Sequence, residues 1–176
     1  MNVPRQRVGS TAVQLSALGF GAAPIGNLYS AVDEGDALAA VTGAFEAGIR
    51  HFDTAPYYGY GLSEARLGRG LAGVPRADYT LSTKVGRCVY DDATAVAGRD
   101  GFAVAGRRAE FDYSADGVRR AFASSLERLG TDYIDVLLLH DIGALTHGDN
   151  HANVLRQALE EALPAMRGVS RASSNR

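Results

Sequence analysis

The chain has 176 residues, of which 46% are hydrophobic and 22% charged, with a formal net charge of −2 at pH 7. This length favours a single domain with one core, and the charge gives no electrostatic reason to bind nucleic acid or an anionic membrane. No apolar run is long enough to span a bilayer, and the first residues lack the apolar centre of a signal peptide. A single cysteine excludes an internal disulfide and fits a reducing compartment, so the cytoplasm is the expected location.

The first predicted element is a β-hairpin over residues 5–18, where a Gly-Ser pair separates two short β-favouring runs. The apolar, glycine-rich run 16–26 predicts a first buried strand. A helix is expected over 33–49, because its apolar residues recur at helical spacing and Asp33 suits the N-cap position.

Strands and helices then alternate: strands at 49–55, 79–86 and 133–141, and helices at 62–73, 114–130 and 152–168. Ser114 is the expected cap of the helix over 114–130. Four strand–helix repeats predict an α/β fold with a parallel sheet covered by helices. The last strand, "VLLLH", is apolar without alternation, which predicts burial on both faces.

Two segments interrupt this alternation. Residues 86–113 show no clear periodicity, so we expect a long, mobile loop that lies over the reaction face as a lid. The chain also reaches "GVSRASSNR", residues 168–176, where a fifth strand is expected, and we interpret this segment as an aberrant tail.

Polar residues follow the predicted strands at their C-terminal ends: Asp53, Lys84, His140 and Asp141. In parallel α/β folds these ends form the reaction face. Side chains two residues apart share a face, so Asp53 points with His51, and Lys84 with Ser82. The segment "FDTAPYYGYGLSE" adds two adjacent tyrosines, a third tyrosine and two glycines shortly after Asp53.

These residue types suit proton transfer. A lysine cation close to a tyrosine favours the phenolate and lowers the tyrosine pKa, and Asp53 is able to hold Lys84 by a charge-assisted hydrogen bond. A neutral histidine donates a hydrogen bond to a substrate oxygen. The set predicts interconversion of a carbinol and a carbonyl, which requires a nicotinamide cofactor as hydride carrier.

The segments "DTAPYYG", "LSTKVG" and "VLLLHD" resemble the aldo-keto reductase family. The resemblance implies that this chain is the N-terminal half of a (β/α)8 TIM barrel, with about four βα units over 19–167 after the hairpin. It also implies a catalytic tetrad: Asp53, Tyr58, Lys84 and His140. The family register selects Tyr58 over Tyr57, and the glycines let the loop turn back over the barrel.

The segments "GFGAAPIGNLY", "FDYSADGVRRAF" and "LTHGDNH" resemble the sugar-oxidising branch, of the D-threo-aldose 1-dehydrogenase type. This likeness implies oxidation of an aldose at C1 to the lactone with NADP or NAD. Pyridoxal 4-dehydrogenases look similar. We expect Gly21, Ala22 and Asp53 to contact the cofactor, and Tyr57 and Asp141 to contact a sugar or aldehyde substrate.

Other polar residues are assigned structural roles. We expect His51 to line the barrel interior, Glu64 to support the loop and helix start, and Cys88 to be a bystander. His147 and His151 are interpreted as solvated loop residues, because their spacing does not suit a metal site, and no metal is expected.

A (β/α)8 barrel needs about 250 residues, so the expected domain, 1–176, is incomplete and looks truncated. A half barrel would expose Leu- and Val-rich interior faces and unpaired strand edges, which predicts self-association. Two alternatives stay open: a non-catalytic remnant that cannot hold cofactor, and a cofactor-free lyase that uses Lys84 as a Schiff base.

Overall fold

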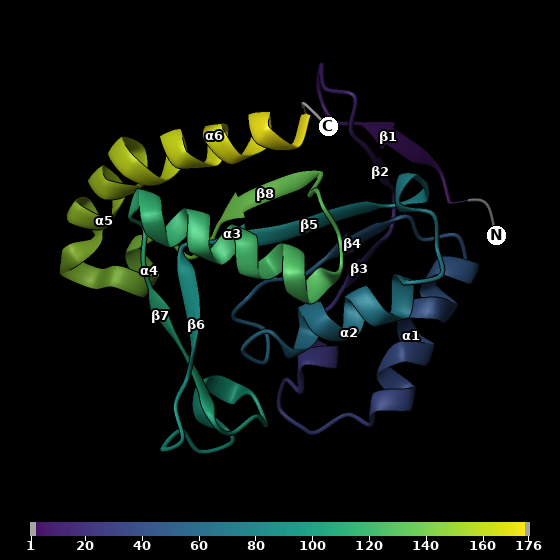
Figure 1. Cartoon of the computed structure of the whole chain (residues 1–176), viewed down its shortest axis with the longest axis horizontal. Coiled ribbons are helices and arrows are strands. Elements are labelled where there is room, and N and C mark those ends of the chain that lie inside the picture. Colours follow the sequence, from purple (N-terminus) through teal and green to yellow (C-terminus); the bar gives the residue numbers. More distant parts are fainter. Residues whose placement is uncertain (1–2, 175–176) are drawn as a thin grey trace.

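The computed structural model describes residues 3–174 and centres on a four-stranded parallel sheet. Its strands lie in the order β3-β4-β5-β8 and are all parallel, as predicted: β3 (Gly19–Gly21), β4 (His51–Asp53), β5 (Thr80–Val85) and β8 (Val136–Leu139). The helices α1 (Glu34–Glu46), α2 (Leu62–Leu71) and α3 (Ala115–Leu129) alternate with these strands in the chain, and α1 packs on α2 and α2 on α3 (Figure 1).

The expected hairpin is present as β1 (Arg5–Arg7) paired antiparallel with β2 (Gln14–Ser16). Ser16 joins it to the sheet, because its Oγ accepts hydrogen bonds from the backbone N–H groups of Arg50 and His51, both at 3.0 Å. Short 3₁₀ turns occupy Pro24–Gly26 after β3 and Arg76–Asp78 before β5. The hairpin therefore fixes the start of β4.

Both predicted helix caps are confirmed. Asp33 accepts hydrogen bonds from the N–H groups of Gly35 and Asp36 at the start of α1, and Ser114 accepts one from Gly117 at the start of α3. Such caps satisfy N–H groups that have no partner within the helix.

The two faces of the sheet differ in residue type. The face toward the helices is apolar and buried, with Phe52, Leu81 and Val85 each at most 1% exposed. The opposite face, the barrel interior, carries mostly glycine and polar residues at the register positions of β3, β4 and β5: Gly19, Gly21, His51, Asp53, Thr80, Ser82 and Lys84. The expected Leu- and Val-rich interior face is therefore limited to β8.

Strand β8 is not buried on both faces, so the burial predicted from its apolar sequence is wrong. Val136 is half-buried, and Leu138, which pairs in register with Lys84 and shares its face, is 43% exposed. Within residues 3–174, β8 has only β5 as a strand neighbour, so it is an edge strand. The apolar run therefore has one uncovered side.

A buried charge joins the sheet to the helices. Glu64 in the first turn of α2 is fully buried and accepts hydrogen bonds from Thr83 Oγ1 on β5 and Arg128 Nε on α3, both at 2.7 Å. A buried carboxylate needs such partners, because desolvation otherwise disfavours its charged form. Glu64 lies in the first turn of α2, where we expect it to support the helix start, and its side-chain partners are on two other elements, β5 and α3.

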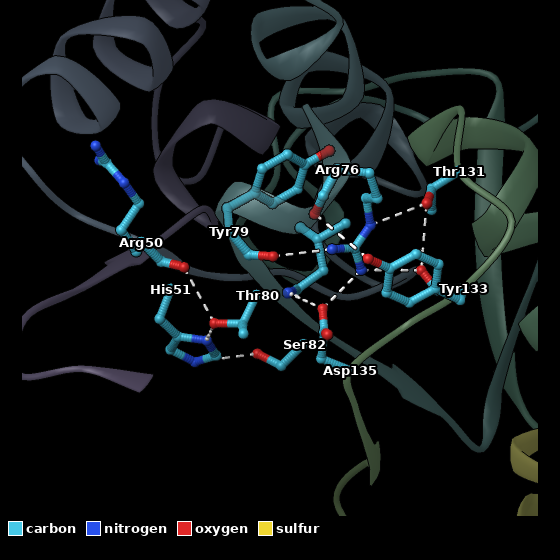
Figure 2. A network of polar contacts seen from close by, with 10 residues as sticks. Arg50, His51, Arg76, Tyr79, Thr80, Ser82, Thr131, Tyr133 and Asp135 are labelled. Atoms are coloured by element: carbon cyan, nitrogen blue, oxygen red, sulfur yellow. Dashed lines mark hydrogen bonds and ion pairs between the residues drawn. The ribbon is translucent and has the colours of Figure 1, made fainter. Parts of the chain in front are cut away.

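A second polar network joins the segments that lead into strands β5 and β8 (Figure 2). Arg76, just before β5, donates to the Tyr79 carbonyl at 2.9 Å, to the Tyr133 carbonyl at 3.0 Å and to Asp135 Oδ2 at 2.6 Å. Its guanidinium also lies over the Tyr133 ring, 3.8 Å from the centroid. Asp135 in turn accepts from the backbone N–H of Leu81 at 2.8 Å. This network fixes the N-terminal side of the sheet, away from the strand ends with the predicted site.

The segment 86–113 is not an irregular loop. It forms an antiparallel pair, β6 (Arg87–Asp91) with β7 (Arg107–Phe111), which projects from the body of the molecule in Figure 1, with a 3₁₀ turn at Arg99–Gly101 between the strands. The strands contain several charged residues, among them Arg87, Asp91 and Arg107, and these hide the strand alternation. The predicted mobility of the segment stays a prediction.

The C-terminal region is helical throughout the described part. A short helix, α4 (Ala144–His147), and a 3₁₀ turn at Gly148–Asn150 lead into α5 (His151–Gln157), a π-helical segment (Ala158–Ala162) and α6 (Leu163–Ser174). Pro164 provides no N–H for the carbonyl of Glu160, and the helix widens just before it. The expected aberrant tail from residue 168 continues α6 as far as Ser174; residues 175–176 lie outside the described part.

None of the helices within residues 3–174 combines the length and the apolarity needed to cross a membrane.

Candidate active site

Three of the four predicted catalytic residues lie at successive strand ends, as expected. Asp53 is the last residue of β4, Lys84 is the penultimate residue of β5, and His140 directly follows β8. The fourth, Tyr58, lies on the loop after β4. All four occupy the C-terminal rim of the sheet.

Lys84 is held firmly at this rim. Its ammonium donates to Asp53 Oδ2 at 2.7 Å and to the carbonyl of Thr54 at 2.8 Å, and its side chain is 12% exposed. Ser82 donates to the other Asp53 oxygen at 2.6 Å. The carboxylate is thus fixed from both sides, and Lys84 has the partner that the sequence predicted.

Tyr58 lies against both Lys84 and His140. The ammonium nitrogen of Lys84 is 4.7 Å from the centre of the Tyr58 ring, and the Tyr58 and His140 rings meet edge to face at 5.8 Å. A cation this close to an aromatic ring is attracted to it. The cluster therefore brings together the tyrosine, the lysine and the histidine of the predicted tetrad.

Two glycines allow the loop that carries Tyr58 to turn. Gly59 has a φ of +63°, and a Cβ there would lie 2.2 Å from the carbonyl oxygen of Gly26; a Cβ on Gly26 would lie 2.8 Å from the carbonyl oxygen of Tyr58. Side chains at either position would push the loop away. The predicted role of the glycines is therefore specific to this backbone contact.

His140 is 9% exposed, and burial lowers its pKa to about 4. Asp141 opposes the shift, whereas Lys84 and Arg87 add to it. The imidazole is therefore neutral at pH 7. Its Nδ1 is buried and has no hydrogen-bond partner among the described residues. A neutral ring in this position has one nitrogen available as a donor, as hydrogen bonding to a substrate oxygen requires.

The two expected substrate contacts also lie at the rim. Tyr57 is half-buried and its ring is 6.0 Å from that of His140. Asp141 is partly exposed, and its Oδ2 accepts a hydrogen bond from Arg87 at 2.7 Å. Both residues flank His140, so their assignment to the substrate stays a proposal with supporting geometry.

The expected cofactor contacts divide into two groups. Gly21 pairs in register with Asp53, and a Cβ at Gly21 would meet nothing within 4 Å, so space is open there. Ala22 is fully buried, its N–H donates to the Asp53 carbonyl, and its carbonyl accepts from Ser63. The side chain of Ala22 is thus enclosed and its backbone groups have partners within the chain, and its contact with the cofactor stays a prediction.

Two residues at the rim, Phe102 and Arg87, were not predicted from the sequence. Phe102 packs against the rings of Tyr57 at 5.3 Å and Tyr58 at 6.4 Å, and Arg87 lies over Tyr57. Both belong to the segment 86–113, so this segment does reach the rim. The only sequence signal was the position of Arg87, three residues after Lys84.

The histidines outside the tetrad need one correction. His51 lines the interior face as predicted, with Nδ1 3.2 Å from Thr80 Oγ1 (Figure 2), and burial lowers its pKa. His147 and His151 are not merely solvated: His147 Nε2 is 2.9 Å from the Asp141 carbonyl oxygen, and His151 Nδ1 is 3.0 Å from that of Ile142. Both rings fix the backbone that follows β8.

Cys88 is buried, and burial raises the pKa of its thiol. This environment disfavours the thiolate, in agreement with a bystander role. Within residues 3–174, no cluster of three or more histidine, cysteine, aspartate or glutamate residues is arranged to hold a metal ion.

The parallel sheet, its covering helices and the polar cluster at the C-terminal rim define an α/β protein of the barrel class, of which four strands are present. The chain belongs to the aldo/keto reductase family, whose family model matches residues 17–172.

It is 40% identical over 171 residues to L-galactose dehydrogenase of Arabidopsis thaliana, covering 96% of this chain and 45% of the relative. It is 38% identical over 174 residues to D-threo-aldose 1-dehydrogenase of a Pseudomonas species, covering 96% and 50%. A solved aldo-keto reductase from Bacillus halodurans, in its holo form, superimposes with a TM-score of 0.70 at 28% identity, covering 98% of this chain and 48% of that one. The chain thus spans about half the length of these relatives, and its fold is that of the N-terminal half of their barrel.

Proposed function

We propose that this chain provides the proton-transfer half of an NAD(P)-dependent oxidoreductase that oxidises an aldose at C1 to the lactone. The observation that carries the proposal is the Lys84–Asp53 ion pair, 2.7 Å long, with its ammonium against the Tyr58 ring and beside a buried, neutral His140. The names of the two sugar dehydrogenases among the relatives support the substrate class.

Each residue has a defined task in this reaction. Tyr58 takes the proton of the anomeric hydroxyl, and the Lys84 cation stabilises the resulting phenolate. Asp53 holds Lys84 in place, which leaves the ammonium without freedom to swing away. His140 donates a hydrogen bond to the sugar oxygen and orients it. The nicotinamide, when bound, accepts the hydride from C1.

The described residues fit the reactive end of such a cofactor. The open space at Gly21, beside Asp53, admits a flat group close to the backbone. The rim cations Lys84 and Arg87, by contrast, are each paired with a carboxylate, so neither is free to neutralise a phosphate. We therefore expect the phosphates to require residues from the other half of a barrel.

Because Lys84 and Arg87 are both engaged in ion pairs, a second candidate function remains: a family member that retains the tetrad without binding cofactor. A titration that follows nicotinamide fluorescence separates the two, because only the first predicts saturable binding. A Schiff-base lyase is disfavoured, because the Lys84 nitrogen is engaged by Asp53 Oδ2 and the Thr54 carbonyl, whereas imine formation requires a nitrogen that is free to attack a carbonyl.

The deciding experiment measures cofactor reduction with L-fucose, D-arabinose and L-galactose. The chain is assayed alone and together with the C-terminal half of the Pseudomonas D-threo-aldose 1-dehydrogenase. We expect almost no turnover alone, turnover in the reconstituted protein, and a loss of about 10²–10⁴-fold in Tyr58→Phe with cofactor binding retained. The matched control is Tyr57→Phe, which should keep most of the activity. A reversed order of the two variants would contradict the assignment of Tyr58.

A further inference from the structure

Arg87 occupies an unusual place for a residue at the start of a projecting hairpin. Its guanidinium lies between the rings of Tyr57 and Phe111, 3.8 and 4.0 Å from their centroids. It donates to Asp141 Oδ2 at 2.7 Å, and the Arg87 side chain is only 12% exposed. The arginine therefore connects the hairpin, the tyrosine loop and the residue next to His140.

The environment of Arg87 leaves one of its hydrogen-bond donors unpaired but holds its guanidinium in a fixed orientation. Its Nε is buried without a hydrogen-bond partner in the described part of the chain. An unpaired buried N–H is unfavourable, and the two aromatic faces offset this cost by cation–π attraction. Only a planar guanidinium fits between two rings and donates to a carboxylate at once, so lysine is not equivalent here.

Asp141, the partner of Arg87, has a strained backbone with φ of +54°. Its carbonyl oxygen is 3.1 Å from Tyr113 Oη and 2.9 Å from His147 Nε2, while its carboxylate is held by Arg87. A non-glycine residue keeps such a conformation only when its surroundings fix it, and such residues concentrate at functional sites. Three side chains from β6, the start of α3 and α4 together fix this one residue.

We propose that Arg87 is a positioning residue of the substrate site, which fixes the Asp141 carboxylate at the rim so that it accepts a hydroxyl group of a polyhydroxylated substrate bound at His140. The sugar part of this inference rests on the proposed function. The Asp141 carboxylate suits the task, because it is 38% exposed and its Oδ2 is 3.6 Å from His140 Nε2. Ionised carboxylates are strong acceptors for hydroxyl groups.

The electrostatics around His140 provide a test that needs no catalysis. The charged groups that face its ring are Asp141, Lys84, Arg87 and Asp53. Arg87→Met removes a cation that lowers the His140 pKa, which favours the protonated imidazole, and it also frees the Asp141 carboxylate from its ion pair. We expect the His140 pKa, followed by NMR of the ring protons, to rise by about one unit. Arg87→Lys should reverse most of that rise, and the exposed Arg119→Met on α3 is the matched control, with no change expected.

Sugar binding provides the second readout. In the reconstituted protein, Arg87→Met and Arg87→Lys should both weaken L-galactose binding about tenfold, because neither side chain fixes the orientation of the Asp141 carboxylate. The affinity for a small aldehyde without hydroxyl groups should stay unchanged. Asp141→Asn should weaken the sugar to a similar extent, and the double variant should lose little more.

The outcomes are separable. If the His140 pKa is the same in Arg87→Met as in the unaltered chain, the Arg87 guanidinium does not lie at the rim beside Asp141 and His140, and the inference is overturned. If sugar affinity is unchanged, or falls equally with the small aldehyde, Arg87 only joins the hairpin to the body and the inference is likewise overturned. If the unaltered protein binds no sugar, the proposed function fails, and the His140 titration still decides whether the Arg87 guanidinium lies beside Asp141 and His140.

Discussion

At the scale of single residues, burial decides the protonation state of His140. The ring packs against the rings of Tyr57 and Tyr58, and its lowered pKa makes it neutral at pH 7. The same burial links the ring to stability, because the unfolded chain has an exposed histidine with an ordinary pKa.

The pH dependence of unfolding should show this link. Between about pH 6.5 and pH 4, His140 binds a proton in the unfolded state but stays neutral in the folded state. The free energy of unfolding therefore falls as the pH falls through this window. We expect His140 to account for up to about 3 kcal/mol of this loss. Urea unfolding at several pH values measures it. His140→Gln should flatten the curve in part, since burial lowers the pKa of His51 as well.

The control for this prediction is His151→Gln, at the start of α5. If its curve flattens as much as that of His140→Gln, the burial of His140 is not the cause.

The buried carboxylate of Glu64 gives a second residue-scale prediction. Glu64→Gln removes the charge that Arg128 needs and alters the bond to Thr83, so we expect a loss of about 2–4 kcal/mol in the free energy of unfolding. Urea unfolding of this variant is compared with the exposed Glu127→Gln on α3, which should change stability by less than about 0.5 kcal/mol. Equal effects would show that Glu64 does not join the sheet to the helices.

At the scale of elements, the loop that carries Tyr58 depends on a backbone contact between Gly26 and Gly59. Its neighbours have fixed positions, because Pro24–Gly26 is a 3₁₀ turn and α2 begins at Leu62. The loop is therefore placed in part by packing between two backbones, in addition to the ring contacts of Tyr57 and Tyr58.

Gly59→Ala tests this contact. The new methyl group would overlap the Gly26 carbonyl, so we expect a loss of at least about 2 kcal/mol and displacement of Tyr58, seen as changed ring signals of His140 in NMR spectra. Gly98→Ala is the matched control: it also has a positive φ, but nothing lies within 4 Å of its Cβ, so only the backbone cost of about 1 kcal/mol applies. Similar losses in both variants would mean that the close approach is unimportant.

At the scale of the whole molecule, the chain presents one covered and one uncovered face. In the part of the chain that the structure describes, β3 and β8 are both edge strands, and the interior face of the sheet is bordered by the exposed Leu138. Unpaired strand edges and exposed apolar residues favour association.

We therefore expect the isolated chain to associate with itself through the β8 edge. Light scattering after gel filtration should show a mass that rises with concentration, and Leu138→Lys should lower it by placing a charge on the exposed interior side. Leu145 on α4 is fully exposed but belongs to a helix and not to the sheet edge, which makes Leu145→Lys the control. A monomer at all concentrations, or equal effects of the two variants, would contradict this prediction.

The sequence by itself determined the order of the elements, the parallel sheet, both helix caps and the placement of Asp53, Lys84 and His140 at strand ends. These features follow from local periodicity, from capping chemistry and from the two-residue repeat of a strand, all of which are short-range. The tetrad register of Tyr58 came from the resemblance to the family, and its contacts with Lys84 and His140 agree with it.

Only the tertiary structure decided the rest. Arg87, Phe102 and His147 reach the rim because a hairpin and a short helix fold back on it, and the backbone of Ala22 is hydrogen-bonded to Ser63 and Asp53. Leu138 is exposed because no described strand pairs beyond β8, although its sequence is typical of a buried strand. Burial and long-range contacts depend on what the rest of the chain places next to a residue, and no local pattern encodes that.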